Sequence, residues 1–169
     1  GGLGVNYDPQ NPNAPTISEY MECVKNGLKD SKVKKVVFEP GRRIVASCGV
    51  FVTSVVRSKN SEDCHFLIVD GGMNDFVRPS LYEAYHAIYE GRLNDLKVET
   101  DIVGPICETA DCFGEKRNLS KMSPGDCLII ADTGAYGYTM ASHYNLRSKP
   151  NEYLITNGKV ELISKHNSY

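Results

Sequence analysis

The pattern of apolar residues changes near Val45, and this change divides the chain in two. Before it, a capping box (T-x-x-E, 16–19) begins a helix in which apolar residues recur at helical spacing to Leu28. A β-branched run over 33–38 then predicts a short buried strand, which the turn at 39–42 ends. A helix followed by a buried strand is typical of the end of a domain built from βα repeats.

After Val45, short strand-like segments follow one another, separated by Gly, Asn and Asp. They predict a mostly β domain over 46–169, an antiparallel β-sandwich or barrel. A short helix is expected over 80–86, and Asn157-Gly158 has the composition of a hairpin turn. The expected strands are 50–56, 65–69, 98–103, 128–131, 152–156 and 159–163.

Composition excludes several classes of protein. The chain has 169 residues, of which 41% are hydrophobic, and a formal net charge of −2. There is no basic field to hold nucleic acid phosphates, and no apolar run approaches the roughly 18 residues of a membrane span. The start carries no charged-then-apolar export signal. We therefore expect a cytoplasmic protein that binds neither nucleic acid nor membrane.

The cysteine pattern gives no indication of a metal site. The six cysteines form no C-x-x-C pair, and the four histidines do not cluster with them. We favour reduced thiols over disulfides, because the chain shows no export signal and is not rich in cysteine.

Two groups of residues near the start are candidates for binding a phosphate. The glycines of 1–4 would let backbone amides approach an anion closely, although a flexible segment explains them equally well. Glu39, Gly41 and Arg42 follow the predicted strand, at the end where α/β barrels carry their sites. A carboxylate there can pair with a protonated ring nitrogen, and a guanidinium can bind a carboxylate through two bonds. An ordinary turn with a surface ion pair is the alternative.

Three further motifs lie in the β part. Arg78 and Tyr82 are four residues apart, so a helix would place both on one face, where they could meet one anion; the alternative places Tyr82 in the core. Cys107 and Glu108 combine a thiol that can donate a proton with a carboxylate that can bind an ammonium group, although most single cysteines are inert. Tyr136 lies between two glycines in a tight turn, where it is either free to reach a ligand or packed.

In this order, the motifs resemble the C-terminal part of the diaminopimelate decarboxylases. That family belongs to the alanine-racemase-like fold class of enzymes that use pyridoxal 5′-phosphate. The similarity extends over nearly the whole chain. The matching stretches are GGLG (1–4), EPGRRIVASCG (39–49), FLIVDGGMNDFVRPSLYEAYH (66–86), DIVGPICETADCF (101–113), GDCLIIADTGAYGYTMASHYN (125–145) and NEYLI (151–155).

The resemblance implies a domain organisation and an assembly. Residues 1–45 would be the last βα unit or units of a TIM-type barrel that binds pyridoxal phosphate, and 46–169 a β domain that contributes to the active site. Members of the family are homodimers whose active sites are shared. Cys107 and Glu108 would therefore act in the barrel of the neighbouring subunit.

The resemblance also implies which residues bind the cofactor. Gly1 and Gly2 would form part of the glycine run that holds its phosphate, together with Gly41 and Arg42. Glu39 would keep the pyridinium nitrogen protonated, which makes the ring an electron sink. Arg42 would also reach the substrate.

The implied reaction is the decarboxylation of meso-2,6-diaminopimelate to L-lysine and CO₂, the last step of lysine biosynthesis. Arg78 and Tyr82 would bind the distal carboxylate of the substrate, and Glu108 an amino group. Tyr136 would contact both cofactor and substrate. Cys107 would be the catalytic proton donor.

One part of the family pattern has no counterpart here. The lysine that binds the cofactor covalently and the histidine that stacks on its ring belong to an earlier barrel segment, and none of the twelve lysines stands in such a motif. We therefore expect the chain alone to be inactive, as the C-terminal part of a longer enzyme or a product of its cleavage. The alternatives are a non-catalytic β module that acts in dimerisation or ligand binding, and a decarboxylase of a related basic amino acid.

Overall fold

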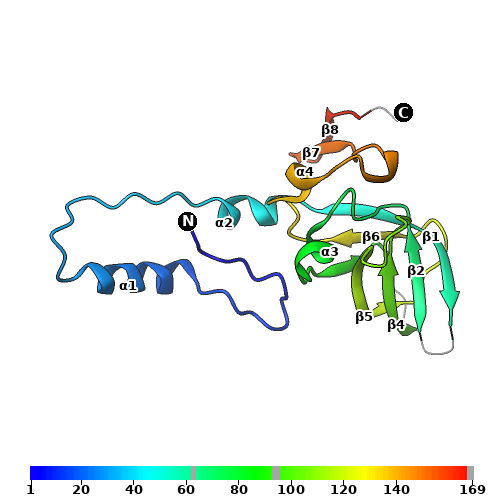
Figure 1. The fold of residues 1–169 in the computed structure, drawn as a ribbon, viewed down its shortest axis with the longest axis horizontal. Coiled ribbons are helices and arrows are strands. Elements are labelled where there is room, and N and C mark those ends of the chain that lie inside the picture. Colours follow the sequence, from blue (N-terminus) through cyan, green and yellow to red (C-terminus); the bar gives the residue numbers. More distant parts are fainter. Residues whose placement is uncertain (62–63, 93–95, 167–169) are drawn as a thin grey trace.

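A curved six-stranded sheet forms the body of the molecule in this computed structural model, which describes residues 1–61, 64–92 and 96–166 (Figure 1). The strand order is β3-β6-β1-β2-β4-β5. The strands are β1 (Phe51–Asn60), β2 (His65–Val69), β3 (Ile88–Glu90), β4 (Lys97–Val103), β5 (Cys112–Ser120) and β6 (Cys127–Ile130).

The two edges of this sheet meet. The Glu90 carboxylate at the end of β3 accepts hydrogen bonds from the Ser120 amide of β5 and from Lys97 Nζ, each at 2.7 Å. The sheet is thereby nearly closed into a barrel, which confirms the expected mostly β fold class.

The core lies inside this barrel. Leu67 and Val69 of β2, and Leu128 and Ile130 of β6, are completely buried. Because alternate residues of a strand point to opposite faces, an apolar residue at every second position faces the interior. Val55, Phe76, Ile102, Phe113, Leu119 and Met122 complete the cluster.

One strand pair corrects the expectation of an antiparallel sheet. Residues 65–68 of β2 pair with 100–103 of β4 in parallel, whereas the other pairs are antiparallel. The chain between them is long and carries α3 (Arg78–Tyr82) and β3. A crossover of that length can return the chain to the sheet in its original direction.

Each strand expected between 50 and 163 is present within a few residues of its predicted bounds, but β3 and β5 were not predicted. The strand β3 has three residues, and the charged and polar residues of β5 hide its apolar positions. The prediction of a helix over 80–86 is wrong in its second half. The helix α3 ends at Tyr82, because Glu83 adopts a left-handed conformation (φ 51°).

A separate hairpin follows the sheet, formed by β7 (Glu152–Thr156) and β8 (Lys159–Ser164). Its turn residues Asn157 and Gly158 have φ angles of 50° and 72°. Positive φ at both central residues is what a two-residue hairpin turn requires, so the predicted turn is confirmed.

Residues 1–41, which we call the arm, extend away from the sheet (Figure 1). The helix α1 (Ile17–Leu28) begins with the predicted capping box, in which the Thr16 amide donates to the Glu19 carboxylate at 2.8 Å. The predicted strand over 33–38 is wrong. These residues have no strand partner in the described part of the chain, and a strand needs a neighbour to satisfy its backbone groups.

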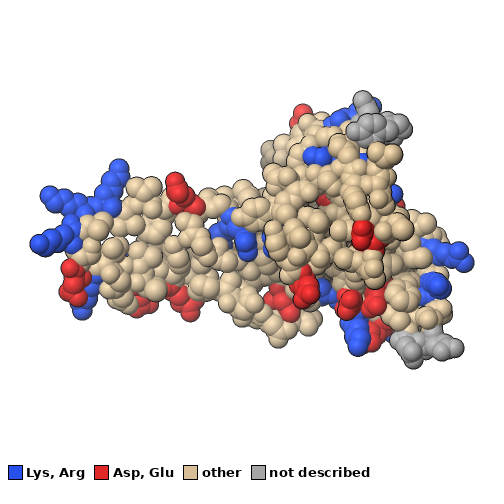
Figure 2. Space-filling view, viewed as in Figure 1, with Lys and Arg blue, Asp and Glu red and all other residues tan. Residues whose placement is uncertain are grey.

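The arm leaves apolar side chains exposed, including Ile17 of α1 and Val37, which is 71% exposed. Figure 2 shows mostly uncharged surface along the middle of the arm, with basic side chains gathered at its tip. A surface of this kind is typical of a segment that another part of a protein covers.

Short helices complete the structure: α2 (Arg42–Val45) and η1 (Ala46–Cys48) join the arm to β1, and α4 (Gly137–Met140) and η2 (Tyr144–Leu146) precede the hairpin. Among the described residues, no helix has both the length and the apolar composition that crossing a membrane requires.

Candidate active site

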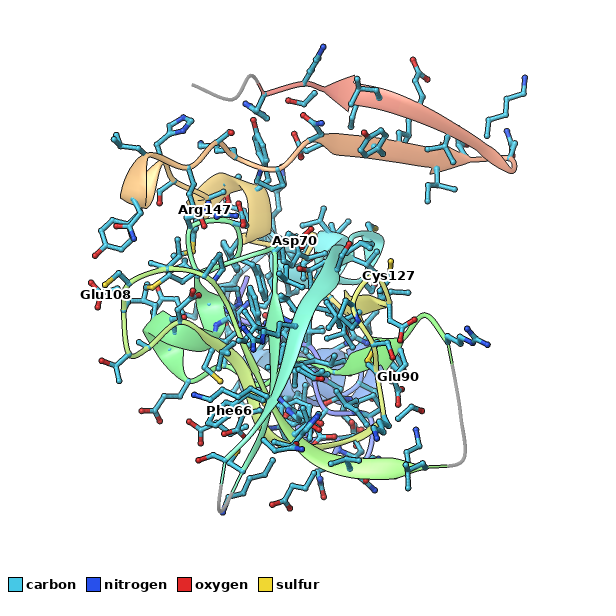
Figure 3. The ribbon with its side chains drawn as sticks, turned by 90° about the vertical axis from the view of Figure 1, so that its right-hand side faces the viewer. Phe66, Asp70, Glu90, Glu108, Cys127 and Arg147 are labelled. Atoms are coloured by element: carbon cyan, nitrogen blue, oxygen red, sulfur yellow. The ribbon has the colours of Figure 1, made fainter. Side chains whose placement is uncertain are left out.

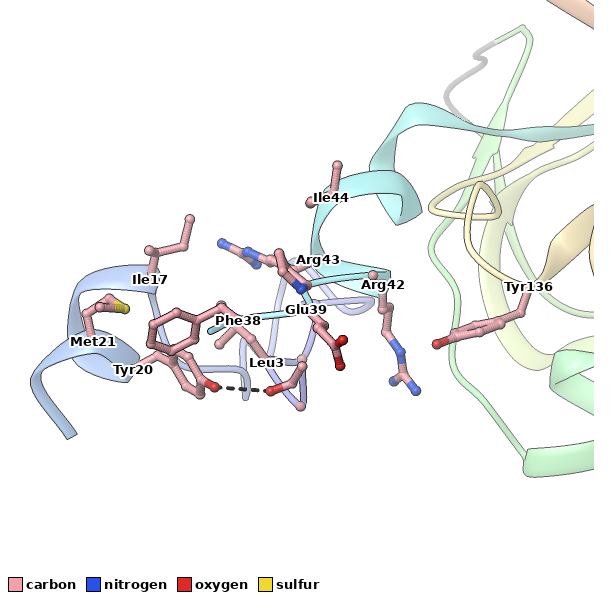
Figure 4. Close-up of a pocket in the computed structure, with 15 residues that line it drawn as sticks. Leu3, Ile17, Tyr20, Met21, Phe38, Glu39, Arg42, Arg43, Ile44 and Tyr136 are labelled. Carbon is pink, nitrogen blue, oxygen red and sulfur yellow. Dashed lines mark hydrogen bonds between the residues drawn. The ribbon is translucent and has the colours of Figure 1, made fainter. Parts of the chain in front are cut away.

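A cleft of about 530 Å³ lies along the arm and extends past α2 to the loop before α4 (Figure 4). Its walls come from the first residues of the chain, the start of α1, the segment before α2, and the loop before α4. The lining includes all six predicted cofactor-binding residues: Gly1, Gly2, Glu39, Gly41, Arg42 and Tyr136.

Backbone rather than side chains forms the glycine wall of this cleft. A Cβ atom at Gly1 would lie 3.1 Å from the Glu39 carbonyl oxygen, and Gly2 has a φ of 93°, which side chains rarely tolerate. The Tyr20 hydroxyl of α1 donates a hydrogen bond to the Gly1 carbonyl at 3.1 Å. The wall is therefore tied to α1, and the open space beside Gly2 leaves room for an anion near the backbone.

Polar groups converge on the opposite side. Figure 4 shows the Glu39 carboxylate, the Arg42 guanidinium and the Tyr136 hydroxyl directed toward the same space. The Arg42 guanidinium carbon lies 5.4 Å from the centre of the Tyr136 ring. Tyr136 itself has a left-handed backbone (φ 67°) at the start of α4.

The loop that carries Tyr136 is tied to η1 by backbone hydrogen bonds. The Gly134 amide donates to the Ala46 carbonyl at 3.0 Å, and the Thr133 amide to the Gly49 carbonyl at 2.9 Å. These bonds hold Tyr136 opposite Arg42, at the junction of the arm and the sheet.

A second cleft, of about 600 Å³, adjoins the first, because Arg42 and Tyr136 line both. It contains the predicted pair Arg78 and Tyr82 of α3. Tyr7 from the arm lies across from them. The structure thus brings eight of the ten predicted site residues to two connected clefts.

Aromatic rings surround the buried guanidinium of Arg78. Its carbon lies 5.3, 5.7 and 5.5 Å from the ring centres of Tyr7, Tyr82 and Tyr136. Only 6% of Arg78 is exposed. The electron-rich faces of the rings attract a cation and partly compensate for its removal from water.

His86 is a member of this cluster that the sequence analysis did not select. It is completely buried, and its Nδ1 lies 2.8 Å from the Ala131 carbonyl, while its Nε2 accepts a hydrogen bond from Arg78 Nε at 3.4 Å. Burial, with smaller contributions from Arg78 and Arg117, lowers the pKa of His86 to about 4 even though the bond to Ala131 opposes this. The imidazole is neutral at pH 7.

Cys107 and Glu108 line neither cleft in the described part of the chain. They occupy an exposed loop after β4, which is held by the Asp111 carboxylate: it accepts bonds from the Ile106 amide at 2.7 Å and the Met73 amide at 2.6 Å. The Tyr144 hydroxyl, which no sequence signal indicated, donates to the Glu108 carboxylate. Figure 3 shows Glu108 at the margin of the molecule.

The side chains of the first cleft fit pyridoxal phosphate. A carboxylate suits its ring nitrogen, and a guanidinium beside a glycine wall suits its phosphate. No lysine stands among the described residues that line the two clefts. Across residues 1–61, 64–92 and 96–166, no three His, Cys, Asp or Glu side chains are grouped as a metal site requires. The six cysteines are free thiols.

Comparisons with known proteins agree with this chemistry. Residues 7–134 match the sequence model of a family described as pyridoxal-dependent decarboxylase, C-terminal sheet domain. The chain is 42% identical, over its full length, to the diaminopimelate decarboxylase of Aquifex aeolicus, and 42% identical over 99% of its length to that of Zymomonas mobilis. It spans 40% of the length of each of these relatives.

A solved structure shows the same fold. The diaminopimelate decarboxylase from Helicobacter pylori, complexed with L-lysine, is 39% identical to the chain and superposes with a TM-score of 0.87. The match covers 98% of this chain and 40% of that one.

Proposed function

The chain belongs to the pyridoxal-dependent decarboxylases, and from this premise we propose that it is the C-terminal part of an enzyme that converts meso-2,6-diaminopimelate to L-lysine and CO₂. The second cleft is the observation that supports this choice of substrate. A buried guanidinium there, with Tyr82 beside it, adjoins the cofactor cleft through Arg42 and Tyr136.

The first cleft holds the cofactor in this proposal. The backbone at Gly1, Gly2 and Gly41, together with Arg42, binds its phosphate, and the Glu39 carboxylate keeps its ring nitrogen protonated. When bound, pyridoxal phosphate supplies an electron sink, which accepts the electron pair that remains when the carboxylate departs as CO₂. A separate barrel segment provides the lysine that holds it covalently.

The second cleft selects the substrate. Arg78 and Tyr82 bind the carboxylate that is not lost, and so orient the other end toward the cofactor. Arg78 is buried, so leaving its charge without a carboxylate is costly. Simple diamines and ornithine, which cannot place a carboxylate there, are therefore rejected.

Cys107 and Glu108 complete the site of a second copy of the chain in a homodimer. Their loop is exposed and separate from both clefts of its own chain, as a group that reaches into another subunit would be. Cys107 donates a proton to the carbon that has lost CO₂. Glu108, held by Tyr144, binds an amino group of the substrate.

The test uses the full-length enzyme with pyridoxal phosphate. It should release CO₂ and L-lysine from meso-diaminopimelate and leave ornithine unchanged. Arg78→Ala should raise KM for meso-diaminopimelate on the order of 30-fold or more, because it removes one partner of a buried charge pair. Arg57→Ala, an exposed arginine of β1 outside both clefts, should change KM less than about 2-fold. Ornithine turnover equal to that of meso-diaminopimelate would contradict the proposal.

A further inference from the structure

One nitrogen of the Arg78 guanidinium has a hydrogen-bond partner within the protein. Arg78 Nε donates to His86 Nε2, and this is the only hydrogen bond of Arg78 among the described residues. The terminal nitrogens Nη1 and Nη2 therefore have no partner in that part of the chain. Because Arg78 lines the second cleft, these nitrogens are the donors available to a ligand there.

The hydrogen bonds of His86 settle which ring nitrogen carries its proton. The Ala131 carbonyl can only accept, so Nδ1, 2.8 Å away, must be the donor. In a neutral imidazole the lone pair then remains on Nε2, on the side of Arg78. A proton on Nε2 would instead place an N–H against the N–H of Arg78.

Close packing restricts the orientation of His86. Its ring centre lies 4.5 Å from that of Tyr7 and 4.8 Å from that of Phe76, which meets it edge to face. The side chain is completely buried. Two aromatic rings and the Ala131 carbonyl therefore hold the imidazole, and with it the acceptor Nε2, in place.

We propose that His86 is a positioning residue. It holds Arg78 by Nε, so that the two terminal nitrogens of Arg78 can bind a carboxylate in the second cleft in a bidentate manner. The inference rests on the proposed function, in which that carboxylate is the one retained by the substrate. Two parallel N–H···O bonds require a guanidinium held in one plane. His86 thereby contributes to the preference for ligands with a carboxylate at this end, without touching them.

Two substitutions of His86 separate this role from packing. The amide of Asn reaches about as far as Nδ1, so His86→Asn keeps a donor for Ala131 and loses the acceptor for Arg78. The amide of Gln reaches about as far as Nε2, so His86→Gln keeps the acceptor. Arg78→Ala is the reference for complete loss of the carboxylate contact.

The measurement is calorimetric binding to the full-length, cofactor-loaded enzyme of two ligands. L-lysine carries the carboxylate, and cadaverine is the same chain without it. We expect His86→Asn to weaken L-lysine binding roughly 10-fold, which corresponds to one hydrogen bond to a charged group, and to leave cadaverine binding unchanged. His86→Gln should stay within about 3-fold of the wild type. In turnover, His86→Asn should raise KM for meso-diaminopimelate more than it lowers kcat.

Each other result has a distinct meaning. Equal weakening of both ligands by His86→Asn would show a role in packing alone and overturn the inference. An unchanged L-lysine affinity in His86→Asn, with a loss in Arg78→Ala, would overturn it while leaving the proposed function standing. An unchanged affinity in Arg78→Ala would overturn both. If His86→Asn does not fold, the ¹⁵N resonances of His86 in the wild-type enzyme decide: a proton on Nε2 rather than Nδ1 contradicts the inference.

Discussion

Arg78 and His86 show how a single backbone angle assembles a site. Had the predicted helix continued to residue 86, the two would lie about 12 Å apart along its axis. Because Glu83 is left-handed (φ 51°), the helix ends and the chain turns back, so that His86 lies directly beside Arg78. The cost of a left-handed residue without glycine is of order 1 kcal/mol, and the contacts of the buried pair offset it.

The buried neutral histidine predicts how stability depends on pH. Its pKa is about 4 in the folded protein and about 6.5 in the unfolded chain. Between these values the unfolded state binds a proton that the folded state does not, so stability falls as pH falls from 6.5 toward 4. By pH 4.5 we expect a loss of about 2–3 kcal/mol from this residue.

Urea unfolding of the full-length protein at pH 7 and pH 4.5 measures this effect. Burial raises the pKa values of Asp75 and Asp111, which acts in the opposite direction on acidification, so the wild type alone does not isolate His86. His86→Gln has no titrating group at this position. Its loss of stability between the two pH values should therefore be smaller than that of the wild type by the stated amount, and equal losses would refute the assignment of a neutral His86.

At the scale of elements, the site depends on how closely η1 approaches the loop before α4. A Cβ atom at Gly134 would lie 2.1 Å from the Val45 carbonyl oxygen and 2.8 Å from the Gly49 amide nitrogen. Both are backbone atoms, which cannot move aside as a flexible side chain would. This contact allows the loop to present Tyr136 to Arg42, so glycine is required where the arm joins the sheet.

Gly134→Ala is therefore expected to lower the stability of the full-length protein by about 1–3 kcal/mol, as overpacking does. Gly27 of α1 provides the matched control, because nothing lies within 4 Å of a Cβ atom there. Gly27→Ala should be neutral or stabilising by up to about 1 kcal/mol, since alanine favours a helix. Thermal unfolding of both variants checks the contrast, and equal melting temperatures would show that the junction can open without cost.

At the scale of the molecule, the two groups of site residues are separate within one chain. Arg78 lies in the second cleft, whereas Cys107 lies on an exposed loop outside both clefts. In the proposed function, a complete site combines these residues with the loop of another copy and with a barrel segment that covers the exposed apolar residues of the arm. The homodimer remains a proposal, and it leads to a quantitative test.

Full-length Arg78→Ala and Cys107→Ala variants should each have little activity under conditions where substrate is limiting. If a site takes Arg78 from one subunit and Cys107 from the other, random mixing after dissociation restores one intact site in each mixed dimer. Half of the dimers are then mixed, so about a quarter of the wild-type activity should return. No recovery in mixtures shown by mass spectrometry to contain mixed dimers would mean that both residues serve the same site from one chain.

Features that depend on neighbouring residues were predictable. The capping box of α1, the Asn157-Gly158 turn, and the strands with apolar residues at every second position follow from local backbone preferences and alternation. The motifs carrying Glu39, Arg42, Arg78 and Tyr136 were likewise visible as short stretches of suitable chemistry. Their roles in binding cofactor and substrate, and the boundary at Val45, stay predictions.

Features that depend on residues far apart in the chain could not be predicted from the sequence. Residues 33–38 have the composition of a strand, but a strand exists only where another lies beside it, and among the described residues none does. The parallel pairing of β2 with β4, the closure of β3 on β5 through Glu90, and the contact of His86 with Arg78 join residues far apart in the chain or across an unpredicted turn. Local composition determines which conformations a segment favours, whereas its partners, and so the shape of the site, follow from burying the core of the whole molecule.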